Sequence, residues 1–250
     1  MKFLRFKTDK VEKKGILENG IIRRIAGNIF TDYTVLDEYY DLSEIHYLPP
    51  VIPGKIICVG RNYSEHALEL NNPLPKRPLL FLKPPSAIIA HEEIIMLPNI
   101  SNRVEYEGEL AVVIGKKCRH INVDEAMNYI FGYSCFNDIT ARDIQLDEKN
   151  FTTAKSFDTF APIGPFIENN ISIESLRIKT IVNGEIKQDG NTKDMIFNIS
   201  SLISFISTIM TLNPGDVIAT GTPKGVGTLN KGDRVEVIID NIGTLRNYVG

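Results

Sequence analysis

The chain has few of the features that mark several protein classes. Its three cysteines, Cys58, Cys118 and Cys135, form no Cys-x-x-Cys pair and no Cys/His ligand spacing, which argues against a disulfide framework or a zinc knuckle. No apolar run approaches the roughly 18 residues of a membrane span, and the charged segment MKFLRFKTDK is not followed by the apolar core of a signal peptide. We therefore expect a cytoplasmic protein whose cysteines are small core residues.

The chain also lacks a strong charge of either sign. Its 28 basic and 31 acidic residues leave a net charge of -3, so no field favours nucleic acid or an anionic membrane as a partner. Of its 250 residues, 43% are hydrophobic and 24% are charged, which is the range of globular proteins that bury a full core. These values exclude a disordered chain.

The order of apolar segments and turns predicts a β-rich α+β protein in two parts. Residues 1–50 alternate short apolar segments with polar turns, which indicates a small hairpin-rich N-terminal domain, and the prolines of YLPPVIPGK mark its end. In residues 51–250 we predict a second domain, of the size of an enzyme domain. Its expected parts are a buried strand in KIICVG, a helix or lid in NYSEHALEL, a surface loop in NPLPKRPLLFLKPP, helices in NVDEAMNYIFGY and at 200–210 with a serine cap, and strands in the C-terminal third.

Three glutamates alternate in RVEYEGELAVVIG, residues 103–115. Alternation along one strand would put Glu105, Glu107 and Glu109 on one face, where their repulsion must be offset by water, a basic partner, protonation or a cation. Asp138 follows a short apolar segment, at a point where a helix could begin. Oxygen-only ligands such as these suit Mg²⁺, Mn²⁺ or Ca²⁺ better than zinc. The alternatives are a solvated strand face and a helix N-cap.

A helix that starts near Asp138 would carry Arg142 and Gln145 on the same face, at i+4 and i+7. A fixed cation and an amide beside a metal ligand could bind an anionic, oxygen-rich substrate. The alternative is an Asp–Arg helix pair worth a few tenths of a kcal/mol, with an incidental glutamine.

His66 and Glu69 lie three residues apart, a spacing that lets a carboxylate hold an imidazole and raise its basicity. Such a pair can take a proton from water, whereas the alternative is a surface ion pair on an amphipathic helix. Lys155 stands among small and aromatic residues in TTAKSFDTF, so it is a candidate functional cation as well as a candidate surface lysine.

The glycine-rich stretch ATGTPKGVG lacks the end of a P-loop and does not fit G-x-G-x-x-G, so it does not predict nucleotide binding. Its backbone N–H groups and the Thr222 hydroxyl could hold a substrate carboxylate. The alternative is a tight β-loop that needs positive φ.

Taken together, these stretches resemble the fumarylacetoacetate hydrolase family over nearly all of residues 55–250. The N-terminal fifty residues match only as the variable small domain that many members carry. The resemblance is carried by CVGRNYSEHALEL, FLKPPSAI, VEYEGELAVVIG, GYSCFNDITARDIQ, KSFDTFAPIGPFI, VNGEIKQDGNTKDMIF, TLNPGDVIATGTPKGVG and IGTLRNYV.

The resemblance implies a mixed β-sandwich or β-roll core with a few helices, in a homodimer. It places divalent-metal ligands at Glu107, Glu109 and Asp138, for Mg²⁺ or Mn²⁺ with Ca²⁺ as a further candidate. It places substrate contacts at Arg142, Gln145, Lys155 and Thr222, with Lys155 also a catalytic residue, and a water-activating dyad on a mobile lid at His66 and Glu69. Glu105 matches no ligand position, so we expect it to support the site from behind or to be solvated.

By the same resemblance, we expect a metal-dependent hydrolase that cleaves a carbon–carbon bond in an acylpyruvate or related 2,4-dioxo acid through a metal-bound enolate. The first alternative is an isomerase or tautomerase of 2-hydroxy-dienedioates, or an oxaloacetate decarboxylase, because these reactions share the enolate. The second alternative is a non-catalytic protein that binds a metabolite or a metal. The expected partner is in each case a small keto acid.

Overall fold

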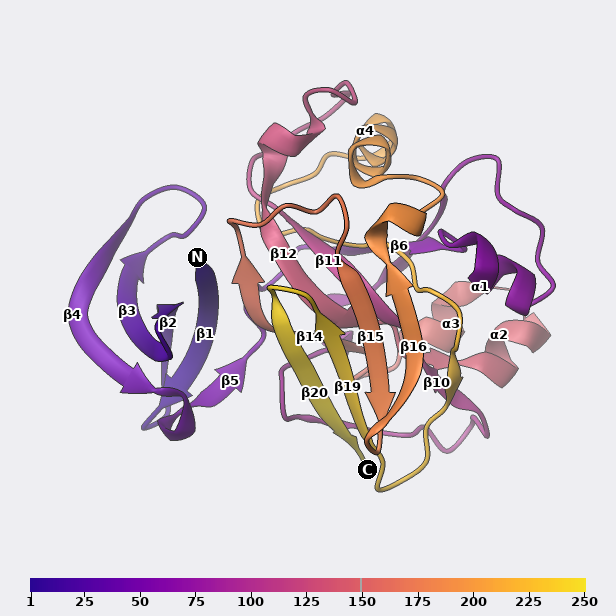
Figure 1. Ribbon diagram of the computed structural model, residues 1–250, viewed down its shortest axis with the longest axis horizontal. Helices are drawn as coiled ribbons and strands as arrows, with labels where there is room; N and C mark the ends of the chain where they lie inside the picture. Colours follow the sequence, from indigo (N-terminus) through magenta and orange to yellow (C-terminus); the bar gives the residue numbers. More distant parts are fainter. Residues whose placement is uncertain (149) are drawn as a thin grey trace.

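The computed structural model describes residues 1–148 and 150–250, and its strands there form three sheets (Figure 1). The largest sheet is ordered β4 (Tyr33–Asp41), β3 (Ile21–Gly27), β2 (Val11–Glu18), β1 (Lys2–Thr8), β14 (Ala161–Glu168), β12 (Ile130–Asn137), β11 (Gly108–Ile114), β17 (Val217–Ala219), β6 (Ile56–Gly60) and β7 (Leu79–Lys83), with β5 (His46–Leu48) on β1 and β8 (Ile88–Ile89) on β14.

Two smaller sheets and a few short helices complete the described chain. One sheet is ordered β16 (Glu185–Asn191), β15 (Arg177–Val182), β19 (Arg234–Ile239), β20 (Gly243–Val249) and β9 (Ile94–Ile95); the other is β13 (Thr140–Ala141), β10 (Val104–Tyr106) and β18 (Gly227–Thr228). The α-helices are α1 (Ser64–Glu69), α2 (Arg142–Glu148), α3 (Phe151–Lys155) and α4 (Ile199–Ile209), and the 3-10 turns are η1 (Leu42–Glu44), η2 (Pro85–Ala87), η3 (Ala126–Tyr129) and η4 (Thr192–Asp194). None of the described helices is long and apolar enough to cross a membrane.

The N-terminal strands β1 to β5 form antiparallel hairpins at the left of Figure 1, as the alternating apolar segments predict. They are not separate from the rest of the sheet, because β1 pairs with β14 through Lys2 opposite Glu168 and Phe3 opposite Ile167. The division at residue 50 stays a prediction.

The core lies on both faces of β11, in the middle of the largest sheet. Leu110 and Val112 pack into a cluster with α4 and the second sheet, whereas Ala111 and Val113 pack on the other face against Phe136 and its neighbours. A strand that is buried on both faces has a continuous run of apolar residues in its sequence, as β11 has from Leu110 to Ile114. The predicted β-rich α+β fold with a sandwich-like core is confirmed.

The three alternating glutamates do not lie on one continuous strand. The chain leaves the sheet of β10 after Tyr106 and enters β11 at Gly108, so Glu107 sits at the break. A β-carbon on Gly108 would lie 2.1 Å from Thr180 Oγ1 of the second sheet, which explains why glycine is needed there. The expectation of one strand running through all three glutamates is therefore wrong.

Three other expectations about local structure are also wrong. Asp138 does not begin a helix: it follows β12, and α2 begins only at Arg142. Residues 122–133 form the short turn η3 and the start of β12, because Ile130 and the following residues pair with β11. The proline-rich segment contains the strand β7, paired with β6. The predicted helix at 200–210 is confirmed as α4, but its cap is Asn198.

Candidate active site

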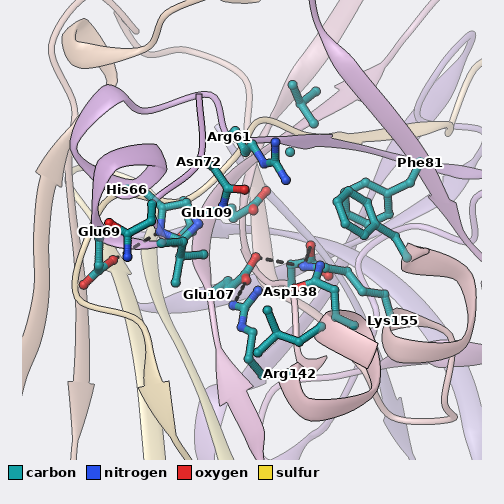
Figure 2. Close-up of a pocket in the computed structure, with 18 of the residues that line it drawn as sticks. Arg61, His66, Glu69, Asn72, Phe81, Glu107, Glu109, Asp138, Arg142 and Lys155 are labelled. Atoms are coloured by element: carbon teal, nitrogen blue, oxygen red, sulfur yellow. Dashed lines mark hydrogen bonds and ion pairs between the residues drawn. The ribbon is translucent and has the colours of Figure 1, made fainter. Parts of the chain in front are cut away.

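A cavity of about 590 Å³ opens where the ends of β11 and β12 meet α1, α2, α3 and β7 (Figure 2). Every residue that the sequence singled out for function lies on its wall: His66, Glu69, Glu107, Glu109, Asp138, Arg142, Gln145, Lys155 and Thr222. The structure thus brings these side chains together from five separate segments, although their chemical roles stay predictions.

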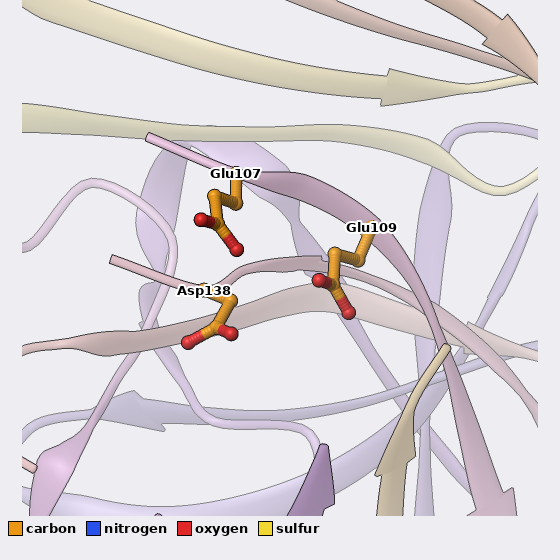
Figure 3. A group of neighbouring side chains, drawn as sticks. All are labelled: Glu107, Glu109 and Asp138. Carbon is orange, nitrogen blue, oxygen red and sulfur yellow. The ribbon is translucent and has the colours of Figure 1, made fainter. Parts of the chain in front are cut away.

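Three buried carboxylates form the floor of this cavity (Figure 3). The antiparallel register of β11 and β12 sets Gly108 opposite Asn137, and the Asp138 amide donates to the Glu107 carbonyl at 2.8 Å. One oxygen from each of Glu107, Glu109 and Asp138 therefore lies within 4.8 Å of the others. Pairing of distant strands, not spacing along one strand, makes the cluster.

Glu107 is held by two cations. Its carboxylate accepts hydrogen bonds from Arg142 Nη2 and, at 2.9 Å, from Lys155 Nζ. Burial alone would raise the pKa of this carboxyl, but Lys155 and Arg142, with a smaller effect from His66, hold the pKa well below its ordinary value. Glu107 is therefore ionised.

Glu109 has no cation against it among the described residues, and its hydrogen-bond donor there is the Gly221 amide at 2.8 Å. Burial raises the pKa of its carboxyl well above the ordinary value, and repulsion by Asp138 and Glu107 raises it further. Glu109 is thus the one carboxylate of the cluster that no cation contacts in the described part of the chain.

A divalent cation fits this donor set. The ligands are all carboxylate oxygens, which Mg²⁺, Mn²⁺ and Ca²⁺ prefer, and the ion would supply the positive charge that Glu109 lacks. Glu107, Glu109 and Asp138 are the residues that would hold it. A solvated strand face and a helix N-cap, the alternatives for these residues, are both wrong because all of them are buried and Asp138 precedes no helix directly.

Lys83 is a member of this cluster that the sequence did not single out. Its Nζ is fully buried and donates to Asp138 Oδ1 and, at 2.9 Å, to the Ile139 carbonyl. Burial lowers the pKa of Lys83, although the neighbouring Asp138 opposes that change. The signal was present in the run LLFLKPP, where a lysine ends an apolar segment, but prolines made the segment look like a surface loop.

Glu105 is not solvated; it is fully buried behind the carboxylate cluster. It accepts hydrogen bonds from Arg142 Nε at 2.7 Å and from Arg103 Nε at 2.7 Å. Glu105 and Glu107 thus hold the Arg142 guanidinium from two sides. Glu105 therefore lies where we expected it, behind the site, and it supports the site by holding Arg142.

Arg142 is the first residue of α2, and its Nη1 donates to the Gln145 side-chain oxygen one turn later. The incidental helix pair between Asp138 and Arg142 is absent from the described contacts, where Arg142 pairs with Glu105 and Glu107 instead. The Thr222 hydroxyl is also engaged, since it donates to the Gly108 carbonyl at 2.9 Å and accepts from Gln188 at 2.8 Å.

His66 lies on α1, with its side chain only 6% exposed and facing the cavity (Figure 2). Its Nδ1 lies 3.3 Å from a Glu69 carboxylate oxygen, and the same carboxylate accepts from the Gly225 amide at 3.0 Å. A proton on Nδ1 would donate to Glu69 and leave Nε2 as a base. The surface ion pair, the alternative for this dyad, does not describe a buried imidazole.

Two further groups that the sequence did not single out line the cavity. Arg61 lies in the turn between β6 and α1, and the Phe81 and Phe151 rings meet edge to face with centroids 5.0 Å apart. Lys155 Nζ lies 5.1 Å from the Phe81 ring centroid, so aromatic surface covers one side of the cationic cluster. The Lys155 side chain is 3% exposed, which excludes a surface lysine.

Comparison with known proteins shows what this chain is similar to. The oxaloacetate tautomerase YisK of Bacillus subtilis is 44% identical over 84% of this chain and 75% of its own length. The structure of 5-carboxymethyl-2-hydroxymuconate delta-isomerase from Mycobacterium smegmatis matches with a TM-score of 0.94 at 36% identity, over 100% of this chain and 99% of that one.

A third relative carries a metal in its structure. Fumarylpyruvate hydrolase from Pseudomonas aeruginosa, solved in complex with Mn²⁺ and pyruvate, matches with a TM-score of 0.75 at 30% identity, over 86% of this chain and 92% of that one. Residues 1–50 match the family described as Rv2993c-like, N-terminal. Residues 55–250 match the family described as fumarylacetoacetate (FAA) hydrolase C-terminal, and the chain belongs to that family of enzymes, which includes tautomerases, isomerases and hydrolases.

Proposed function

We propose that this chain is a divalent-metal-dependent enzyme that moves a proton at the carbon next to the keto group of a 2-oxo acid, and so interconverts its keto and enol forms. One observation carries the proposal: the carboxylate cluster and the His66–Glu69 pair, with its buried imidazole, face the same cavity. The similarity to an oxaloacetate tautomerase and to a delta-isomerase supports proton transfer as the reaction.

The chain's own groups divide the work in this proposal. Arg142 and Lys155 hold the substrate carboxylate and keto oxygen by their positive charge, and Gln145 adds an amide next to Arg142. His66 Nε2 takes the proton from the carbon, which leaves an enolate, and then gives that proton to the enolate oxygen to complete the enol; the reverse steps return the keto form, and Glu69 fixes the imidazole throughout. When bound, Mg²⁺ or Mn²⁺ supplies a Lewis acid that polarises the keto oxygen.

Cleavage of a carbon–carbon bond is the second candidate function. In this reaction His66 faces a water molecule instead of the C–H group of the substrate, and the same His66–Glu69 pair can deprotonate that water. The similarity to a fumarylpyruvate hydrolase at 30% identity supports this candidate. An acylpyruvate or another 2,4-dioxo acid would be the substrate.

The expected metal ion, oligomeric state and location are also part of the proposal. We propose Mg²⁺ or Mn²⁺ as the ion, because an all-carboxylate cluster favours hard cations and one relative is solved with Mn²⁺. We also propose a homodimer located in the cytoplasm. Sedimentation of the purified protein tests the dimer.

The test compares two acids and two variants. Protein with Mn²⁺ is given oxaloacetate and, separately, acetylpyruvate, and the enol absorbance and the products are followed. We expect rapid loss of the oxaloacetate enol without release of CO₂, abolished by a chelator and by His66→Gln. Glu65→Gln on the same helix is the matched control, because Glu65 is exposed and pairs only with exposed Lys224 in the described chain. Cleavage of acetylpyruvate at a higher kcat/KM than oxaloacetate tautomerisation would favour the hydrolase. Release of CO₂ as the main product, or full activity in His66→Gln, would overturn both candidates.

A further inference from the structure

Most cations on the wall of the cavity are already paired with carboxylates. Arg142 pairs with Glu105 and Glu107, Lys155 pairs with Glu107, and Arg103 pairs with Glu105. The Arg61 guanidinium differs, since no carboxylate among the described residues lies within ion-pair distance of it. It is a half-buried positive charge on the cavity wall with no neutralising partner in the described chain.

Arg61 is also held on a fixed piece of backbone. Its φ of 57° lies in the left-handed region, which arginine rarely adopts. The next residue is the fully buried Asn62, whose amide nitrogen donates to the carbonyls of Thr220 at 2.8 Å and Phe197 at 3.0 Å, and whose amide oxygen accepts from the Phe197 amide at 2.8 Å. The Asn62 carbonyl accepts a further bond from the Ile196 amide at 2.8 Å. The structure thus maintains an unfavourable φ at a residue that faces the cavity.

Arg61 lies across the cavity from the site of the proposed reaction. In Figure 2, Arg61 and Asn72 stand on one side of Glu109, and Arg142 stands on the opposite side with the carboxylate cluster between. The Phe81 ring forms the wall next to Arg61 in the same view. A short carbon chain could therefore lie against aromatic surface while its two ends meet positive charge.

We propose that Arg61 binds a second carboxylate of the substrate, so that the cavity selects 2-oxo dicarboxylic acids over 2-oxo monocarboxylic acids. The inference rests on the proposed function, because it assumes that the first carboxylate and the keto group bind at the carboxylate cluster. A guanidinium forms charge-assisted, two-pronged bonds to a carboxylate. A substrate without the second carboxylate leaves the half-buried Arg61 charge partly desolvated and unpaired, which lowers its binding.

Two acids that differ at one end test the inference. Oxaloacetate carries a carboxylate where 2-oxobutyrate carries a methyl group, and exchange of the C3 protons with D₂O, followed by NMR and corrected for the uncatalysed rate, reports enolisation of both. We expect wild-type protein with Mn²⁺ to prefer oxaloacetate. In Arg61→Asn, kcat/KM for oxaloacetate falls by roughly 10- to 100-fold, mainly through KM, as expected for a charge-assisted hydrogen bond, while that for 2-oxobutyrate stays within about twofold.

Controls separate recognition from folding. Asparagine tolerates the left-handed region, so Arg61→Asn keeps the turn, and a urea unfolding curve checks this. Arg61→Lys restores part of the oxaloacetate rate because it returns the charge without the planar fork. Arg77→Gln removes an exposed arginine of the loop after α1 and leaves both rates unchanged.

The outcomes distinguish this inference from the proposed function. Equal loss for both acids in Arg61→Asn, or no loss for either, overturns the role of Arg61 while the proposed function stands. If wild-type protein exchanges neither acid, the proposed function fails, and calorimetry with Mn²⁺ then decides the inference. It survives if oxaloacetate binds wild type more tightly than 2-oxobutyrate and Arg61→Asn abolishes the difference; it is wrong if the difference persists or neither acid binds.

Discussion

Glu105 is the side chain whose replacement best tests how the site is supported. Only 1% of its side chain is exposed, and it accepts bonds from the buried Arg142 and from Arg103. Glu105 does not belong to the carboxylate cluster that would bind the cation. Replacing it changes what holds Arg142 without removing any proposed ligand.

The expected cost follows from the burial of each pair. Removing one partner of a buried ion pair costs about 3–5 kcal/mol, because the other charge is left uncompensated. The bond to Arg103 adds less than about 1 kcal/mol, since half of the Arg103 side chain is exposed. We therefore expect Glu105→Ala to lower the free energy of unfolding by about 4 kcal/mol. Glu105→Gln keeps an acceptor for Arg142 Nε and should cost about 2 kcal/mol.

Thermal and urea unfolding measure these values. At about 2–4 °C per kcal/mol for a chain of this size, Glu105→Ala should lower Tm by roughly 10 °C and Glu105→Gln by about half as much. Glu185→Gln is the matched control, because Glu185 also pairs with a basic side chain, Lys187, but the two side chains are 73% and 41% exposed. It should leave the free energy of unfolding and Tm unchanged, because an exposed ion pair contributes little.

Kinetics give an independent readout. With its support removed, Arg142 keeps Glu107 and Gln145 as partners but is no longer fixed from both sides, so KM for a 2-oxo acid should rise in Glu105→Ala. Glu105→Gln should show a smaller rise in the same parameter. Equal stability of Glu105→Ala and the Glu185→Gln control would refute the reasoning, because it would mean that Arg142 needs no buried counter-charge.

Two further perturbations follow from the charges in the structure. In metal-free protein, Glu109→Gln should leave the free energy of unfolding unchanged or raise it, since it removes repulsion, whereas Glu107→Gln should lower it by about 2–4 kcal/mol because Lys155 loses a buried partner. Urea unfolding in the presence of a chelator measures this difference, and equal unfolding of the two variants would contradict it. In Mn²⁺ calorimetry both variants should lose affinity for the ion. Burial lowers the pKa of His91 from 6.5 to about 4, so between these pH values the unfolded chain binds more protons than the folded chain. The contribution of neutral His91 to the free energy of unfolding is therefore fully present above pH 6.5 and is lost as the pH falls toward 4. The loss is about 3 kcal/mol, at 1.36 kcal/mol per pKa unit. His91→Asn should flatten that slope, and an unchanged slope in unfolding curves across this pH range would count against the assignment.

Much of the fold could be predicted because it depends on local patterns. Apolar residues at helical spacing identify α4, and the run after Gly108 identifies β11, since period and burial are written in consecutive residues. The residue types of the site were also recognisable, because the resemblance supplied their positions. Their convergence could not be derived from spacing, as it depends on the register of β11 against β12.

The errors arose where distant contacts override local patterns. Alternation predicted one strand through the three glutamates, but Gly108 packs against Thr180 from a strand of another sheet and the chain breaks there. Prolines predicted a surface loop around Lys83, although β7 pairs with β6 just before them and takes the lysine into the interior. In both cases the deciding partner lies far away in the sequence, where a local pattern carries no information about it.

The charges of the whole site suggest why so many lysines and arginines surround the acidic cluster. With Glu105 included, the buried carboxylates of the site and the cations around them are equal in number, so a divalent ion bound with Glu109 ionised would leave two positive charges in excess. Arg61 and Glu69 also lie on the cavity wall; they do not pair with each other in the described chain, but their opposite charges leave this net excess unchanged. A substrate with two carboxylates restores neutrality, whereas one with a single carboxylate does not. The same preference for dicarboxylic acids follows from this balance and from the position of Arg61. The charges counted, all in the described part of the chain, are those of the cluster and of Glu105 behind it, that is Glu105, Glu107, Glu109 and Asp138, against Lys83, Arg103, Arg142 and Lys155.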